Sequence, residues 1–204
     1  MKIILILASV FLGTLTYSLS EVFAANTLAP YRGVQGSLLK KIPFKDASGD
    51  YTLILTQKEY IENDYPDDSS MCLTNLDLYA YAFKEMGDGL PKRLFYMHDF
   101  VHNCIASTTA EFTADTPVIT DLDNNGHAEI WLIYYISCHG DVSPDGLKIL
   151  MYEDGKKHAR RGQTFVHVDG MNMGGKYKDD PAMQQAAPVF KDFANELWKK
   201  HMHR

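Results

Sequence analysis

The residues whose types and spacing best suit chemistry form one acidic segment, DLDNNGHAE, at positions 121–129. It offers oxygen atoms at alternate positions, and Ca²⁺ prefers six to eight oxygen ligands at short range. The expected ligands are the side chains of Asp121, Asp123, Asn125 and Glu129 and the backbone carbonyl of His127. A glycine at the sixth position permits the sharp turn that such a loop needs. The segment therefore predicts a calcium-binding loop.

The flanks of this segment indicate which kind of calcium loop it is. An EF-hand requires a glutamate at position 12 and a helix on each side, but Leu132 stands at that position. Residues 118–120 and 130–132 are strand-like instead. The loop therefore resembles the strand-flanked calcium loops of FG-GAP and VCBS-type proteins, in which the last acid is at position 9. A polar β-turn without a metal is the alternative, because Asp, Asn and Gly also build turns.

A second candidate functional loop, residues 138–144, follows the apolar run 129–137. A strand of that length spans roughly 30 Å, so the two loops are expected at opposite ends of it. His139, Asp141 and Ser143 have the residue types of a catalytic triad. Three neighbours on one loop do not readily line up as base, orienting group and nucleophile. We expect the aspartate and the serine to fix the loop through hydrogen bonds between side chains and backbone.

Residues 1–24 have the pattern of a secretory signal peptide: a positive start, an apolar run, and small residues in Val22-Phe23-Ala24 ahead of Ala25. The apolar run is short for a membrane anchor. We therefore expect a cleaved leader and a periplasmic or secreted protein. No other stretch is apolar and long enough to suggest a membrane span in the mature chain.

Export makes a disulfide the expected state of two of the three cysteines and leaves the third as a thiol. If the hairpin of residues 73–101 is centred on Asp88, Cys72 lies opposite Cys104, and a bridge between them is feasible. A bridge between Cys104 and Cys138 is the competing arrangement. A zinc site built from these cysteines and nearby histidines is disfavoured, because the chain has no closely spaced pair typical of structural zinc.

Strand-like runs dominate the chain between positions 36 and 168. They lie at residues 37–43, 51–56, 73–83, 92–101, 117–120, 129–137, 147–153 and 156–160. We expect a mainly β fold (β-rich α+β) with one antiparallel, meander-like sheet. Residues 59–70 are acidic and poor in apolar side chains, and they are expected to form a surface loop.

The end of the chain has a helical period instead. Apolar residues recur every three to four positions from Val189 to Trp198, and Pro188 suits the first turn of a helix. We expect residues 25–204 to form a single domain that ends in an amphipathic helix at about 182–201. The helix should pack on the sheet, and the histidines near the terminus should belong to a flexible tail.

Composition excludes several classes of protein. With 46% hydrophobic and 23% charged residues, the chain has the composition of a globular protein. Its net charge of −6 and its lack of a long basic tract argue against a nucleic-acid partner. The sequence lacks the motifs of nucleophile elbows, zincin helices, P-loops and dinucleotide-binding folds. It therefore nominates no catalytic residue.

Six segments of the sequence carry a resemblance, at residues 76–81, 99–104, 119–131, 138–162, 174–177 and 190–200. They resemble a family of small exported bacterial proteins, largely uncharacterised, some of which are labelled surface polysaccharide biosynthesis proteins. The resemblance covers about residues 76–200, and its most specific block begins at Cys138. It implies a disulfide between Cys104 and Cys138, with Cys72 as the extra thiol.

These observations predict an exported, non-enzymatic accessory or binding protein of the cell envelope that holds a structural calcium ion. Its expected partner is an envelope component or glycan, with a link to surface polysaccharide. The alternative is an envelope enzyme that acts on glycans through carboxylates that the sequence does not identify.

Overall fold

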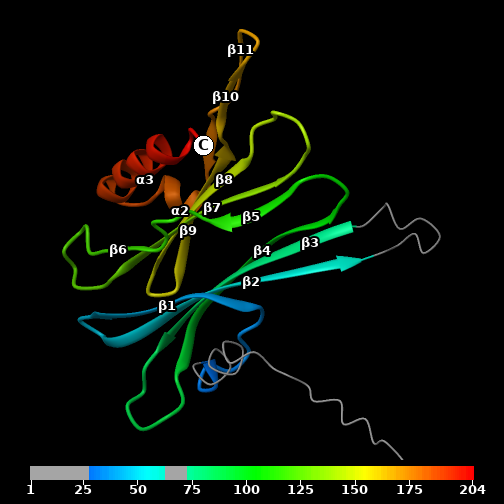
Figure 1. Cartoon of the computed structure of the whole chain (residues 1–204). Coiled ribbons are helices and arrows are strands. Elements are labelled where there is room, and N and C mark those ends of the chain that lie inside the picture. The colour runs from blue at the N-terminus through cyan, green and yellow to red at the C-terminus, as the bar shows by residue number, and fades with distance from the viewer. Residues whose placement is uncertain (1–27, 63–72) are drawn as a thin grey trace, which may run out of the picture.

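The computed structural model describes residues 28–62 and 73–204, and both the expected signal peptide and Cys72 lie outside these ranges. Within them, antiparallel strands predominate and two short helices lie near the C-terminus (Figure 1). The predicted β-rich α+β class is confirmed.

Four strands form a meander in chain order, which we call the first sheet: β1 (Ser37–Asp46), β2 (Gly49–Glu62), β3 (Leu73–Lys84) and β4 (Lys92–Cys104). The polar end of β2 pairs with the start of β3 as far as Glu62. The surface loop expected at residues 59–70 is therefore a strand over its first four residues, because backbone pairing with β3 does not require apolar side chains. The rest of that expected loop lies outside the described ranges.

The remaining long strands form the second sheet: β5 (Thr108–Phe112), β6 (Val118–Thr120), β7 (Glu129–Cys138), β8 (Gly146–Glu153), β9 (Lys156–Gln163) and β12 (Tyr177–Asp179). The strand order is β12-β9-β8-β7-β5, and β6 shares the same edge of β7 with β5. The hairpin of β10 (Phe165–Val168) and β11 (Met171–Gly174) projects beyond the body of the molecule (Figure 1).

The division into two sheets corrects the expectation of one. The two sheets pack face to face, and the core between them contains Leu53 and Leu78 from the first sheet and Leu132 and Leu150 from the second. Successive side chains of a strand point to opposite faces. Because β3 and β7 are apolar on both faces, each sheet needs a cover on two sides, and one sheet with one helix would leave apolar faces exposed.

Two helices cover the outer face of the second sheet: α2 (Pro181–Gln184) and α3 (Pro188–His201). The longer helix begins at the expected proline and ends at the expected residue, while the preceding turn is a separate helix capped by Asp180. The apolar stripe of α3 packs against Trp131, Ile133 and other outer-face side chains. None of the helices in the described ranges is both long and apolar enough to cross a membrane.

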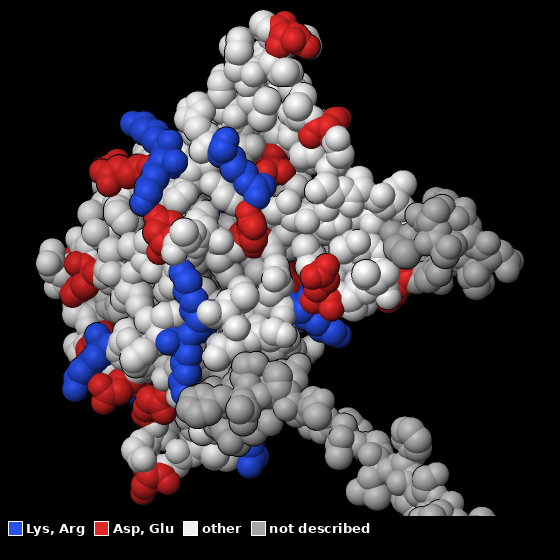
Figure 2. Space-filling view, viewed as in Figure 1, with Lys and Arg blue, Asp and Glu red and all other residues white. Residues whose placement is uncertain are grey.

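Surface charge does not separate into one acidic and one basic face. In the view of Figure 2, acidic and basic side chains are interspersed over the visible surface. Any preference for a charged ligand must therefore come from a local cluster of side chains.

Candidate functional site

The acidic loop is the connection of the β6–β7 hairpin, in which Thr120 lies opposite Glu129. Its turn needs positive backbone angles, with φ of 57° at Asn124 and 83° at Gly126. A Cβ atom on Gly126 would also lie only 3.1 Å from the Cβ of Ala47 in the β1–β2 turn. Glycine at this position therefore serves both the turn and the close approach of the neighbouring hairpin.

Three carboxylates converge inside this loop. Each of Asp121, Asp123 and Glu129 offers an oxygen, and these oxygens all lie within 4.8 Å of one another. The two aspartates are exposed, whereas Glu129 is fully buried. Its carboxylate accepts hydrogen bonds from the Thr120 hydroxyl at 2.6 Å and from the Leu122 amide at 3.0 Å. The buried carboxylate is thus held in place, and the three acids together could bind a metal ion.

The other two expected ligands lie in the same loop. The side-chain oxygen of Asn125 accepts a hydrogen bond from the His127 amide at 2.7 Å, and its amide group donates to Glu153 at 2.7 Å. The imidazole of His127 lies 3.3 Å from a carboxylate oxygen of Asp154. The ring is therefore directed towards a neighbouring hairpin, which leaves the backbone carbonyl as the group that this residue would offer to a metal.

Further carboxylates border the loop, and the sequence analysis did not include them. Asp46 in the β1–β2 turn accepts a hydrogen bond from the Ala128 amide at 3.3 Å. Glu153 and Asp154 come from the β8–β9 turn. Within the described residues, no lysine or arginine forms an ion pair with a carboxylate of the loop or with Asp46, Glu153 or Asp154. Asp50, across the β1–β2 turn, does pair with Lys45 at 3.5 Å. The sequence does show that these acids lie at turns between strands. It does not show that the three turns meet at one end of the sandwich, which only the folded chain brings about.

The disulfide lies at the opposite end of β7. Cys104 is bonded to Cys138, and their Cα atoms are 5.7 Å apart. The alternative bridge from Cys72 to Cys104 is therefore wrong. Irregular register between β3 and β4 places Cys104 opposite Thr74, so the simple mirror about the turn does not hold. The bridge joins β4, the last strand of the first sheet, to β7 of the second.

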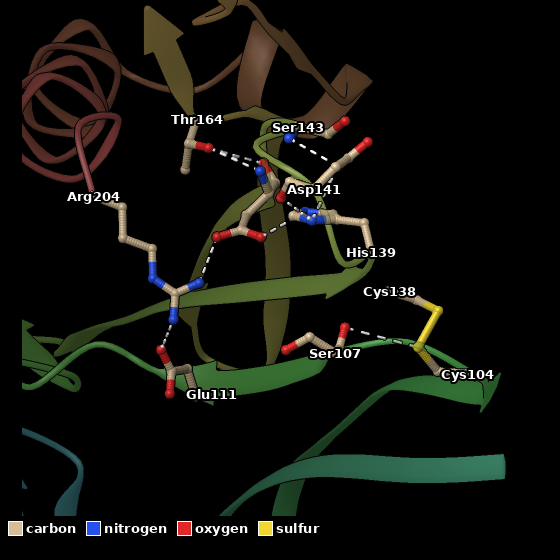
Figure 3. Close-up of polar contacts among 10 residues, drawn as sticks. Cys104, Ser107, Glu111, Cys138, His139, Asp141, Ser143, Thr164 and Arg204 are labelled. Carbon is tan, nitrogen blue, oxygen red and sulfur yellow. Dashed lines mark hydrogen bonds and ion pairs between the residues drawn. A yellow bond between two sulfur atoms is a disulfide. The ribbon is translucent and has the colours of Figure 1, made fainter. Parts of the chain in front are cut away.

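The second candidate loop lies next to this disulfide (Figure 3). Its polar contacts centre on Asp145, the residue that follows it. Nε2 of His139 lies 3.1 Å from a carboxylate oxygen of Asp145, and the guanidinium of Arg204 pairs with the other oxygen. Arg204 also pairs with Glu111 on β5. The network thus ties the C-terminus to the loop and to the edge of the second sheet, a link between distant residues that no local motif indicates.

Asp141 and Ser143 have the positioning role that was expected of them. The carboxylate of Asp141 accepts a hydrogen bond from the Ser143 amide at 3.0 Å. The hydroxyl and amide of that serine lower the pKa of Asp141. His139 contacts the backbone carbonyl of Asp141 at 3.2 Å and the carboxylate of Asp145. The serine hydroxyl is thus engaged by the aspartate, which is not the arrangement of a catalytic triad.

The end of the chain is packed, which corrects the expectation of a flexible tail. The side chain of His201 is largely buried, and its backbone carbonyl accepts a hydrogen bond from the Tyr135 hydroxyl at 2.9 Å. The ring of His203 contacts Phe165 edge-on. The tail packs against the outer face of β7 and the start of β10, which lie next to each other here.

The Asp145 network predicts a dependence of stability on pH. Burial acts to raise the pKa of Asp145, but hydrogen bonds from Ser137 and Arg204 outweigh burial, and the pKa is lowered. A carboxylate with a lowered pKa stabilises the fold fully above the unfolded value of about 3.9, and this contribution is lost as the pH falls below it.

The substitution Asp145→Asn should therefore lower the free energy of unfolding by about 1–3 kcal/mol at pH 7, and the difference from wild type should shrink towards zero as the pH approaches about 2. Urea unfolding across this pH range measures it. Asp88→Asn, in the exposed β3–β4 turn, is the control and should show no such pattern. A constant difference at every pH would contradict the charge-based explanation.

Comparisons of the chain with family models, with curated proteins and with solved structures found no match.

Proposed function

We propose that the chain is an exported, non-enzymatic binding protein of the cell envelope, periplasmic or secreted, stabilised by a calcium ion bound at residues 121–129. The observation that carries the calcium proposal is the convergence of the Asp121, Asp123 and Glu129 carboxylates. The disulfide supports export, because disulfides persist in oxidising compartments. The resemblance in the sequence favours surface polysaccharide as the envelope component.

Calcium fits this loop better than other common ions. All the expected donors are oxygen atoms, which calcium and magnesium prefer, whereas zinc and copper favour nitrogen and sulfur. Magnesium demands near-ideal octahedral geometry, while calcium tolerates irregular sets of carboxylates and carbonyls. Without a cation, the carboxylates of Asp121, Asp123 and Glu129 repel one another at short range. A bound Ca²⁺ would remove this repulsion and fix the hairpin end of the sandwich.

The test is the melting temperature of the oxidised protein in calcium and in chelator. Loops of extracellular type bind calcium with a Kd of about 10⁻⁴ to 10⁻³ M. At a hundredfold excess over Kd, linkage predicts about 2.7 kcal/mol of stabilisation. For a domain of this size, that corresponds to a rise of about 5–10 °C. Asp121→Ala should abolish the rise without disturbing the buried Glu129.

Asp88→Asn removes a carboxylate from a distant turn and should keep the full calcium response. An equal rise in the Asp121→Ala protein, or no rise in wild type, would contradict the calcium proposal. An equal rise with Mg²⁺ at the same concentration would contradict the choice of metal.

A further inference from the structure

A basic cleft lies where β4, the edge strand of the first sheet, passes over the inner face of β8 and β9. Its volume is about 390 Å³, and its lining comes from both sheets. The residues that matter for recognition are Tyr134, Lys148, Tyr152, Lys157 and Arg161. The volume falls in the range of small-molecule sites, roughly 300–1,000 Å³.

The pairing of the strands places positive charges side by side on this face. Lys148 on β8 lies opposite Arg161 on β9, and Arg161 lies opposite Lys178 on β12. Lys157 points to the same face, opposite Tyr152. Like charges directly opposite each other on neighbouring strands are destabilising. The row therefore lowers the stability of the fold. Its positive charges are concentrated here although the chain as a whole has a net charge of −6.

The nearest acids do not neutralise the row. Asp99 accepts hydrogen bonds from Lys148 at 2.5 Å and from the Tyr134 hydroxyl at 2.8 Å, so it compensates only the first lysine. Asp179 is paired with Arg160, which points to the opposite face. Within the described residues, Lys157, Arg161 and Lys178 form no ion pair. Lys157 and Arg161 therefore line the cleft without an ion-pair partner in the described part of the chain. Lys178 lies beside Arg161 in an adjoining hollow, which Asp179 and Asp180 also line.

Protection of a sheet edge accounts for only part of this row. Lysine on an edge strand discourages pairing with a second molecule, and both Lys178 on β12 and Lys157, which lies beyond the end of β12, are at that edge. Lys148 and Arg161 are not, because each is paired on both sides by a neighbouring strand. The cleft also offers a neutral donor. Burial raises the pKa of Tyr152 to about 12, so its hydroxyl keeps its proton.

We propose that this cleft binds an acidic sugar, that is, a ring-sized ligand that bears a carboxylate or a phosphate. The guanidinium of Arg161 has the planar fork that matches either group. Lys157 supplies further positive charge within the cleft and Lys178 supplies it beside Arg161, and the Tyr152 hydroxyl can donate to a ring oxygen or hydroxyl. The inference names a ligand for the proposed binding role and in that respect rests on it, but its residues are separate from the acidic loop.

The experiment is a calorimetric titration of the purified, oxidised protein at low ionic strength with four probes: glucuronate, glucose 1-phosphate, glucose and inorganic phosphate. The two acidic sugars should bind, and glucose should not. Arg161→Ala should weaken binding of the acidic sugars by about tenfold or more, because it removes a charge-assisted pair of hydrogen bonds. Raising the salt from about 0.01 M to about 0.1 M should weaken it further.

Lys45→Ala is the matched control, because this exposed lysine lies on β1 and its only ion-pair partner among the described residues, Asp50, is also exposed. It should leave the affinity unchanged. Arg161→Ala should leave the melting temperature unchanged or slightly higher, since it removes two like-charge contacts. A preference for glucuronate over glucose 1-phosphate identifies the carboxylate as the group recognised, and the reverse preference identifies the phosphate.

Three results would overturn the inference: no binding of either acidic sugar, equal affinity in the Arg161→Ala and Lys45→Ala proteins, or binding of inorganic phosphate as tight as that of both sugars. The calcium-dependent melting shift is measured on the same proteins. If the acidic sugars do not bind but calcium still raises the melting temperature, only the proposed cleft site is refuted. If the sugars bind but calcium does not raise the melting temperature, only the proposed calcium site is refuted.

Discussion

Replacing Arg160 by methionine is expected to lower the free energy of unfolding by about 3–5 kcal/mol, because it removes one partner of a buried ion pair. The Arg160 side chain is only 2% exposed. Its guanidinium donates to both carboxylate oxygens of Asp179, at 2.7 and 2.9 Å, and to Asn195 of α3 at 2.6 Å. It also lies 3.8 Å from the centre of the Tyr177 ring. One side chain thus joins β9, β12 and α3.

Urea unfolding measures this prediction, and the neighbouring residue provides its control. Arg161→Ala removes an exposed arginine from the same strand, on the face opposite to that of Arg160, so stability should change by no more than about 0.5 kcal/mol. Adding Asp179→Asn to Arg160→Met should recover part of the loss, because the uncompensated carboxylate is then gone. If Arg160→Met and Arg161→Ala cost the same, the contacts of Arg160 do not hold β12 and α3 to β9.

Loss of the disulfide is the second large effect expected. The bond between Cys104 and Cys138 closes a loop with a sequence separation of 34. The chain-entropy model assigns such a loop about 4 kcal/mol of stability. Cys138→Ser should lower the free energy of unfolding by about that amount, and the loosened region should be the corner between β4 and β7, where the bond joins the two sheets.

Hydrogen exchange of the amides in β5 and at the end of β7 locates the loosening, and urea unfolding gives its size. The double substitution Cys104→Ser and Cys138→Ser should cost no more than Cys138→Ser alone, since both remove the same bond. Cys72→Ser should leave stability unchanged, because Cys104 is already bonded to Cys138. A large loss from Cys72→Ser would contradict the pairing.

The local patterns of the sequence were sufficient for the secondary structure that positions the acidic loop. The turn before Gly49, the Asp154-Gly155 hairpin and the helix that starts at Pro188 depend on near neighbours in the chain, and all are found where they were expected. The short strands β5, β10, β11 and β12 were missed, because their few residues carry too little alternation to be distinguished from loop.

The acidic loop itself could also be found in the sequence, since its candidate ligands lie within nine consecutive residues. The acids that border it could not, because Asp46 and Glu153 reach the loop only when three hairpins meet at one end of the sandwich. The same limit applies to the contact between Asp145 and Arg204, whose partners are far apart in the chain.

By itself, the sequence determined where the longer strands lie, which face of the final helix is apolar, and that one loop carries the oxygens for a cation. The disulfide between Cys104 and Cys138, which the resemblance implied, is confirmed. Only the tertiary structure decided that two sheets share a core and that a basic row is left uncovered beside β4. The physical reason is that alternation identifies the residues that share a face of a strand, whereas the pairing of sheets and small shifts of register determine what that face meets.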